Sequence, residues 1–317
     1  MTPKARTVFL GTGAFAVPVL AALSEQPAID LLAVVTAPQR PGSRGRPTDP
    51  PVATWALEHG LPLLRPVRLR APEAVDEIAE LRPELLVLAD YGQLVPTRLL
   101  DLPSHGALNL HPSVLPRHRG ATPIPAAILA GDAETGVTLM RMDSGLDTGP
   151  VVGQRRHALT GHETAPELEK QLAEVGARLV VATLPQWLAG EIKAEPQDAD
   201  GATLTRPLRR EDGRLDPGKG AEELERQVRA YQPWPGSFVD LSSGRIVVWS
   251  ASVAEERATR IETGTLTLTT HGGLALATGD KLLELREVQP AGGRRMSGAE
   301  LLRGRPGLVN SLVLSGR

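Results

Sequence analysis

The sequence of 317 residues contains no cysteine. Without cysteine the chain has no disulfide bond, no thiolate ligand for a metal ion and no cysteine nucleophile. Long hydrophobic runs are also missing. The first apolar segment, residues 7–10, is too short for the core of a signal peptide, and no run reaches the ~20 residues that cross a membrane. We therefore expect a cytoplasmic protein.

The sequence has no large excess of charge of either sign, because 35 basic residues oppose 37 acidic ones and the net charge is −2. This balance excludes a basic coat over the whole surface, so a site for a polyanion must be a local patch. Residues 1–206 hold 19 basic and 23 acidic residues, whereas residues 207–317 hold 16 and 14. The second part is therefore the more basic one. The length predicts two domains.

Short apolar runs alternate with amphipathic stretches over the first part of the chain. We expect strands over residues 7–10, 31–36, 61–64, 85–89 and 107–111. We expect helices over residues 15–23, 52–59, 72–81, 94–100 and 165–188. This alternation predicts an α/β fold with an open, mostly parallel, doubly wound Rossmann-like sheet. The runs 137–142 and 151–156 have no helix between them, so we expect them to join the sheet as antiparallel strands.

The pattern changes near residue 190, where a polar stretch with several prolines begins. We expect one helix over residues 221–231 and then short strands over 238–241, 246–250, 264–269, 274–277 and 281–288. Short strands separated by glycine turns predict a small C-terminal β-barrel of the OB-like kind. The predicted division is a catalytic domain over residues 1–190, a linker over 191–206 and the barrel domain over 207–317.

A glycine motif follows the first predicted strand. Gly11-Thr-Gly13-Ala-Phe-Ala16 fits the G-x-G-x-x-A pattern of dinucleotide-binding proteins. That interpretation makes the chain an NAD(P)-dependent oxidoreductase. It also requires an acidic residue at the end of the second strand, whereas Asp30 lies before that strand. Small residues equally permit a tight turn between a strand and a helix, so this alternative lacks its confirming context.

Asn109 and His111 end a predicted strand two positions apart, so their side chains lie on the same face. Ligands of open α/β sheets bind beyond the carboxyl ends of the strands. Asp147, in a loop bounded by glycines, can bring a carboxylate to the same place. An amide donor, an imidazole and a carboxylate suit direct acyl transfer between two bound substrates. From the residues alone, a buried asparagine that holds a loop and a surface histidine explain the pattern equally well.

A resemblance decides between these interpretations. Asn109-x-His111, Ser113-Val-Leu-Pro116 with Arg119-Gly120, and Leu146-Asp-Thr-Gly149 resemble the signature of formyltransferases that use 10-formyltetrahydrofolate. Similar stretches occur in both halves of the chain, at residues 9–16, 40–46, 91–96, 131–138, 229–236 and 289–292. Within the family the chain is most similar to the branch that acts on methionyl-tRNA, over essentially its whole length.

The resemblance implies transfer of a formyl group from 10-formyltetrahydrofolate to the α-amino group of initiator methionyl-tRNA, without a metal ion. It implies a catalytic triad of Asn109, His111 and Asp147. It implies folate binding by two segments, namely Ser113, Val114, Leu115 and Pro116, and Tyr91, Gly92, Gln93 and Leu94. The chain has Pro112, Val114 and Ala14 where the family commonly has glycine, leucine and an acidic residue. We expect Asp147 to raise the pKa of His111, because a nearby negative charge favours the imidazolium.

Three arginines, Arg40, Arg44 and Arg46, lie in a segment with almost no apolar residues. By itself this pattern is typical of a solvated surface loop. The resemblance implies that the segment contacts the acceptor end of the tRNA, where arginine can bind phosphate and stack on bases. Arg294 and Arg295 fit phosphate contacts in the C-terminal domain, and a solvated turn explains them equally well. We expect a monomer.

Three other interpretations are kept besides the dinucleotide enzyme. A formyltransferase that acts on a nucleotide amino sugar can share the triad and a similar C-terminal domain. The purine-pathway relative is shorter and lacks that domain, so the length of this chain argues against it. An RNA-binding module on an inactive scaffold is disfavoured, because all three residues of the triad are present.

Overall fold

The computed structural model describes residues 4–41, 47–258 and 261–314, which divide into two compact units. The first unit comprises the described residues up to Pro123, together with Ala133–Leu159 and Leu168–Arg206. The second comprises Ile124–Asp132, Thr160–Glu167 and the described residues from Pro207 onwards. No helix within these described ranges is long and apolar enough to cross a membrane.

The first unit is built on a seven-stranded sheet with the order β10-β9-β7-β6-β1-β2-β5. Its parallel strands are β1 (Ala5–Gly11), β2 (Ile29–Val35), β5 (Leu63–Leu64), β6 (Leu85–Ala89) and β7 (Ala107–His111). Strand β9 (Glu134–Arg141) pairs antiparallel with β7, and β10 (Val151–Ala158) pairs antiparallel with β9. This arrangement confirms the predicted doubly wound sheet and its two antiparallel additions.

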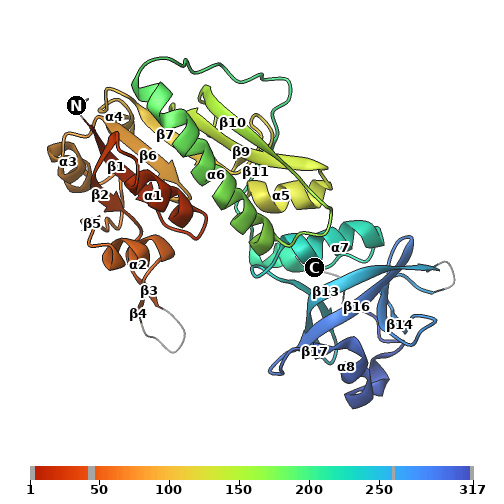
Figure 1. Cartoon of the computed structure of the whole chain (residues 1–317). Helices are drawn as coiled ribbons and strands as arrows, with labels where there is room; N and C mark the ends of the chain where they lie inside the picture. Colours follow the sequence, from red (N-terminus) through yellow and green to blue (C-terminus); the bar gives the residue numbers. More distant parts are fainter. Residues whose placement is uncertain (1–3, 42–46, 259–260, 315–317) are drawn as a thin grey trace. The chain divides into compact units, whose positions relative to one another are not determined.

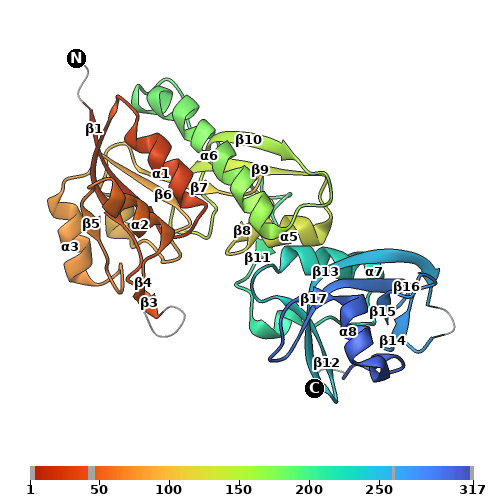
Figure 2. The same ribbon diagram turned by 60° about the horizontal axis from the view of Figure 1, so that its bottom comes forward.

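Helices cover both faces of this sheet. They are α1 (Ala16–Ser24), α2 (Pro51–Glu58), α3 (Pro72–Glu80), α4 (Thr97–Leu100) and α6 (Ala165–Leu188). Helices α1 and α6 lie side by side on one face (Figures 1 and 2). At Gly176 of α6, an added Cβ would lie 3.2 Å from Leu110 of β7 and 3.5 Å from Val19 of α1, so a residue without a side chain allows close packing. On the other face Ile78 and Leu99 pack in one core cluster with strands β1 and β6.

The sequence did not predict several of the two-residue strands, an apolar helix in the first half of the chain or a short helix near its end. Strand β3 (Arg40–Pro41) pairs with β4 (Pro47–Thr48), and β8 (Arg119–Gly120) pairs with β11 (Leu204–Thr205). Strands of two residues are too short to show an alternation of apolar and polar side chains. Helix α5 (Pro123–Ala130) was missed because its residues are almost all apolar and give no helical period.

The second unit is built on a curled antiparallel sheet (Figure 1). Its strands follow the order β12 (Ser237–Leu241), β13 (Gly244–Arg257), β16 (Lys281–Pro290), β15 (Leu274–Ala277) and β14 (Leu266–Leu268), and β17 (Met296–Ser297) pairs with β16. Register shifts along β13 mark bulges, which bend a strand and increase its twist. Helices α7 (Ala221–Ala230) and α8 (Gly298–Gly304) contribute Leu224 and Leu301 to its core. The predicted fold class of this part is confirmed.

Candidate active site

Strand β7 presents Asn109 and His111 on one face of the sheet. Its alternate residue Leu110 points the other way, towards α6. The His111 side chain is 5% exposed, and Asn109 is half-buried. Within the described residues, the Asn109 amide has no hydrogen-bond partner, so its two N–H donors remain available to a ligand.

The imidazole of His111 has a defined hydrogen-bond geometry. Its Nε2 lies 2.9 Å from the carbonyl oxygen of His118, and because a carbonyl only accepts, Nε2 carries a hydrogen. Its Nδ1 lies 3.6 Å from Oδ2 of Asp147. Burial lowers the pKa of His111, although the charge of Asp147 and the hydrogen bond to His118 act in the opposite direction. Asp147 therefore acts in the predicted direction, but the net pKa of His111 is lowered because the loss of hydration outweighs the pull of one carboxylate.

Asp147 reaches His111 because of the direction of β9. This strand runs antiparallel to β7 and ends beside Ala107, where Met142 N–H donates to the Ala107 carbonyl at 2.7 Å. The following loop returns over the face that carries His111. Asp147 adopts φ +52°, and its Oδ2 accepts a hydrogen bond of 2.8 Å from Gly120 N–H. The structure thus brings His111 and Asp147 together, with Asn109 two residues before His111.

The loop after β7 is fixed by the residues predicted to bind folate. Ser113 and Leu115 are buried, and Ser113 Oγ donates to the carbonyl of Arg117 at 2.6 Å. The Thr138 hydroxyl accepts from Leu115 N–H and donates to the Ser113 carbonyl. Val114 and Pro116 are only half-buried. Ser113 and Leu115 therefore anchor the loop, while Val114 and Pro116 keep accessible surface.

The second segment predicted to bind folate also contains both buried or half-buried residues and exposed residues. Tyr91 is buried in the core cluster of β1, β6, α3 and α4, and its hydroxyl has no partner within the described chain. Burial raises the pKa of Tyr91 to about 12. The side-chain oxygen of Gln93 accepts a hydrogen bond of 2.9 Å from Leu69 N–H. Gly92 and Leu94, in contrast, are exposed. The Tyr91 and Gln93 side chains thus support the segment, and Gly92 and Leu94 present its surface.

Two carboxylates cover the glycine turn that resembles a dinucleotide fingerprint. Asp90 follows β6, and its Oδ2 would lie 1.7 Å from a Cβ added to Gly13. Glu169 of α6 accepts the Phe15 N–H at 3.2 Å, at the beginning of α1. A pyrophosphate needs free N–H donors and no neighbouring negative charge at this turn. The two carboxylates at this turn therefore disfavour binding of a pyrophosphate, which argues against the dinucleotide interpretation.

Asp90 as a whole residue is exposed, but its carboxyl group lies against Gly13, and its backbone carbonyl accepts hydrogen bonds from Thr12 and Gly13 N–H. Burial of that group, with a further contribution from the charge of Glu169, raises the pKa of Asp90 to about 6. Sequence reasoning missed Asp90. Its place directly after a buried strand was an available signal, because parallel strands bring their carboxyl ends to one edge.

The polar segment after α6 is not a free connection. Glu195 bridges to Val151, and Leu204 and Thr205 pair with Arg119 and Gly120 of the loop after β7. Thr203 Oγ1 accepts the His118 N–H at 2.8 Å. Residues 195–205 therefore hold the loop that contacts His111 and Asp147. The polar composition of the segment gave no signal for this packing.

The arginine segment predicted to contact tRNA is described only in part. Arg40 lies in β3, whose partner β4 begins at Pro47. Arg44 and Arg46 lie outside the described residues. Their roles stay a prediction.

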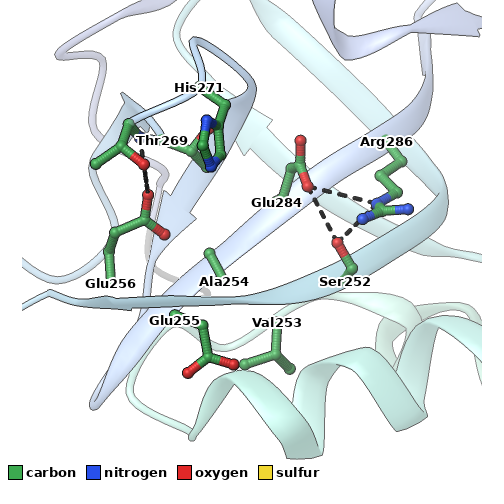
Figure 3. Close-up of a pocket in the computed structure, with 10 residues that line it drawn as sticks. Ser252, Val253, Ala254, Glu255, Glu256, Thr269, His271, Glu284 and Arg286 are labelled. Atoms are coloured by element: carbon green, nitrogen blue, oxygen red, sulfur yellow. Dashed lines mark hydrogen bonds and ion pairs between the residues drawn. The ribbon is translucent and has the colours of Figure 1, made fainter.

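A concavity of about 390 Å³ lies on the second unit, between β13, β16 and the β14–β15 connection (Figure 3). Arg286 Nε donates to Ser252 Oγ at 2.7 Å, and Ser252 Oγ donates to Glu284 at 3.1 Å. Glu256 accepts two hydrogen bonds from Thr270. Its polar groups are largely paired with each other, and its glutamates make it unsuitable for a phosphate chain.

Comparisons with known proteins identify the family of this chain. The family described as formyl transferase matches residues 5–184, and the formyl transferase C-terminal domain matches residues 207–306. A methionyl-tRNA formyltransferase of Halorhodospira halophila is 46% identical over 306 residues, covering 95% of this chain and 96% of that protein. One from Myxococcus xanthus is 43% identical over 302 residues and covers 95% of each chain.

Solved structures share the fold at low identity. HypX from Aquifex aeolicus, solved in complex with tetrahydrofolic acid, aligns with a TM-score of 0.64 and 18% identity over 94% of this chain and 47% of that chain. The sugar 3N-formyl transferase WlaRD aligns with a TM-score of 0.64 and 16% identity over 89% and 97% of the two chains. The predicted family resemblance and enzyme class are confirmed. The chain belongs to the formyl transferase family, together with the methionyl-tRNA formyltransferases that it matches over nearly its whole length.

Proposed function

We propose that this protein transfers the formyl group of 10-formyltetrahydrofolate to the α-amino group of initiator methionyl-tRNA. The observation that carries the proposal is the pairing of His111 with Asp147 beside the free amide of Asn109. The relatives named methionyl-tRNA formyltransferase support this acceptor, at 38–46% identity over nearly the whole chain. The sugar formyltransferases support the fold alone, because their identity to this chain is low.

The reaction forms a C–N bond between the amine and the formyl carbon and breaks the bond from that carbon to N10 of the folate. One proton moves from the attacking nitrogen to N10, so no other reactant is needed. The Asn109 amide donates to the oxygen of the formyl group as it gains negative charge. Loss of such a donor costs about 2.7–4 kcal/mol, on the order of 10²–10³ in rate.

His111 and Asp147 handle the proton. The lowered pKa of His111 keeps its imidazole neutral in the resting protein, with the hydrogen on Nε2. Nδ1 is then free to accept the proton of the attacking amine, and Asp147 at 3.6 Å stabilises the imidazolium that forms. His111 returns the proton as the folate nitrogen leaves. We therefore assign His111 the role of proton carrier and Asp147 that of its counter-ion.

The accessible residues near this site suit a folate. Val114 and Pro116 keep apolar surface beside His111, and Leu94 is 82% exposed on the segment after β6. Sites for aromatic ligands combine apolar contacts with a few polar groups that fix orientation. The exposed backbone of Gly92 and the side chains of Val114, Pro116 and Leu94 would provide such contacts. The residues that hold them in place are Ser113, Leu115, Tyr91 and Gln93.

We assign tRNA contacts to Arg40, Arg44 and Arg46, because a segment with three arginines can neutralise several phosphates. We also retain the division into a catalytic domain over residues 1–190, a connecting segment over 191–206 and an OB-like domain over 207–317. The C-terminal family match from residue 207 is in keeping with this division.

The test is transfer of a labelled formyl group from 10-formyltetrahydrofolate to charged initiator tRNA, with a UDP-4-amino sugar as a competing acceptor. We expect labelled formylmethionyl-tRNA and no labelled sugar. His111→Asn should lower the transfer rate on the order of 10²–10³ while the protein stays folded. Transfer to the sugar alone would contradict the proposed acceptor, and full turnover of folded His111→Asn would contradict the assigned mechanism.

A further inference from the structure

Gln197, in the segment after α6, makes side-chain hydrogen bonds to the loop that carries Asp147 and to the loop after β7. Its neighbours Pro196 and Asp198 are exposed, whereas Gln197 is half-buried. Its Nε2 donates to the carbonyl oxygens of Asp147 at 2.8 Å and of Gly149 at 2.7 Å. Both hydrogens of the amide nitrogen are thus used on the loop that carries Asp147.

The other end of the same amide holds the loop after β7. Oε1 of Gln197 accepts from Arg119 Nε at 3.0 Å and from Arg119 Nη2 at 2.8 Å. A guanidinium only donates and a carbonyl only accepts, so this environment fixes the orientation of the amide. Gln197 therefore joins the two loops that meet at Asp147, one through Arg119 and the other through the backbone of Asp147 and Gly149.

Asp147 needs such support because of its backbone. Its φ of +52° lies in the left-handed region, which costs a residue other than glycine about 1 kcal/mol or more. The side chain must also stay within 3.6 Å of His111 Nδ1. A hydrogen bond to the carbonyl of Asp147 itself opposes rotation of this peptide away from that geometry.

We propose that Gln197 is a positioning residue of the reaction, which holds Asp147 opposite His111 by linking the Asp147–Gly149 backbone to Arg119. The inference rests on the proposed function, because it assigns Asp147 a role in formyl transfer. Gln197 acts through Asp147 and does not itself touch the reacting atoms.

An isosteric substitution tests separately the two sets of hydrogen bonds that Gln197 makes, those to Arg119 and those to the Asp147 and Gly149 carbonyls. Gln197→Glu keeps an oxygen for Arg119 but replaces both donors by an acceptor that repels the two carbonyl oxygens. Gln197→Ala removes both sets. Asp198→Ala is the matched control, because the Asp198 carboxylate accepts only the Asp200 N–H at 3.0 Å among the contacts of the described chain.

The full-length variants are compared by steady-state and single-turnover formyl transfer to charged initiator tRNA. We expect kcat to fall roughly 10- to 100-fold in Gln197→Glu and Gln197→Ala, as for other misplaced catalytic groups. The KM values should change by less than about threefold, and Asp198→Ala should match the wild type. Thermal unfolding shows whether each variant is folded.

Two further readouts distinguish positioning from general stability. Adding Gln197→Ala to Asp147→Asn should produce less than about a twofold further loss, because both changes remove the same interaction. The pKa of His111, followed by NMR, should fall in folded Gln197→Ala. Asp147 and His118 are the titratable groups beside His111. Of these two residues, Gln197 bonds directly only to Asp147, so Gln197→Ala should act on the pKa of His111 through the Asp147 carboxylate.

The outcomes are distinct. An active wild type with unimpaired kcat in Gln197→Glu overturns the inference, as does an equal loss of kcat in the Asp147→Asn background. A wild-type chain that makes no formylmethionyl-tRNA overturns the proposed function instead.

Discussion

At the scale of single residues, the site is governed by competition between burial and charge. His111 has a carboxylate on one side and a carbonyl on the other, and both favour the imidazolium, yet its pKa is lowered. The cause is burial, since the charged ring loses more hydration than these partners return. A neutral imidazole suits a group that must first accept a proton.

This balance predicts the effect of Asp147→Asn on His111. The change removes the charge that raises the pKa, so the pKa of His111 should fall further. The measurement is an NMR titration of the imidazole Cε1–H, assigned with His111→Asn. An unchanged or higher pKa in the variant would show that Asp147 does not act on this ring.

Asp90 predicts a pH-dependent stability. Its pKa in the folded protein is about 6, above the ordinary value of 3.8. The folded state thus binds the proton more tightly, so this contribution is complete below about pH 4 and is lost as the pH rises through 6. Above that pH the ionised carboxylate destabilises the fold.

Asp90→Asn should therefore raise the melting temperature at pH 8 by roughly 1–3 °C and raise it by clearly less at pH 4.5, where most of the contribution of the protonated carboxyl is still present. We expect a stabilisation of about 1 kcal/mol, less than the full pKa shift implies, because part of Asp90 is exposed and solvent screens its charge. The measurement is thermal unfolding of both proteins at the two pH values. Equal stabilisation at both would mean that the charge of Asp90 is not the cause.

At the scale of elements, the short strand pair β8–β11 determines the shape of the catalytic loop. Gly120 has φ +105°, and an added Cβ would lie 2.3 Å from the Thr205 carbonyl oxygen. Its N–H also donates to Asp147. Glycine is thus required at this position for the approach of β11, and the same residue supports the carboxylate.

Gly120→Ala should destabilise the protein by about 2–3 kcal/mol and lower the transfer rate, because both β8 and the Asp147 contact shift. Gly190→Ala is the matched control. Gly190 also has a positive φ, +71°, but nothing lies within 4 Å of an added Cβ, so we expect about 1 kcal/mol and normal activity. Chemical denaturation and transfer assays test both variants, and similar effects from the two would refute the requirement for close packing.

At the scale of the whole molecule, the near-zero net charge makes the location of arginines decisive for tRNA binding. In the second unit Arg294 and Arg295 are exposed, and the Arg295 guanidinium lies 3.4 Å from the centre of the Trp249 ring. The concavity of Figure 3, in contrast, contains Glu255, Glu256 and Glu284. A phosphate chain should therefore approach the arginine pair and avoid the glutamates.

Arg295→Ala should weaken tRNA binding several-fold at low salt and reduce the slope of log K against log salt by about 0.7–0.9, the value for one phosphate contact. Glu255→Ala serves as the control and should leave the slope unchanged. The measurement is a binding titration at a series of salt concentrations. A slope that Arg295→Ala does not alter would remove this arginine from the interface.

Much of the architecture could be predicted because it depends on local pattern. The alternation of strands and helices gave the doubly wound sheet, and the helix over residues 165–188 was predicted at its observed bounds. The period of two along a strand placed Asn109 and His111 on one face. Such properties follow from neighbouring residues, so the sequence by itself determined them, together with the family.

The tertiary structure decided what depends on residues distant along the chain. Asp147 faces His111 because β9 turns back beside β7, and Gln197 reaches the same loop from a segment that looked like a linker. The sign of the pKa shift of His111 depends on how much protein surrounds the ring. Burial and contacts between separate loops arise only when the chain has folded, and no local pattern of side chains records them.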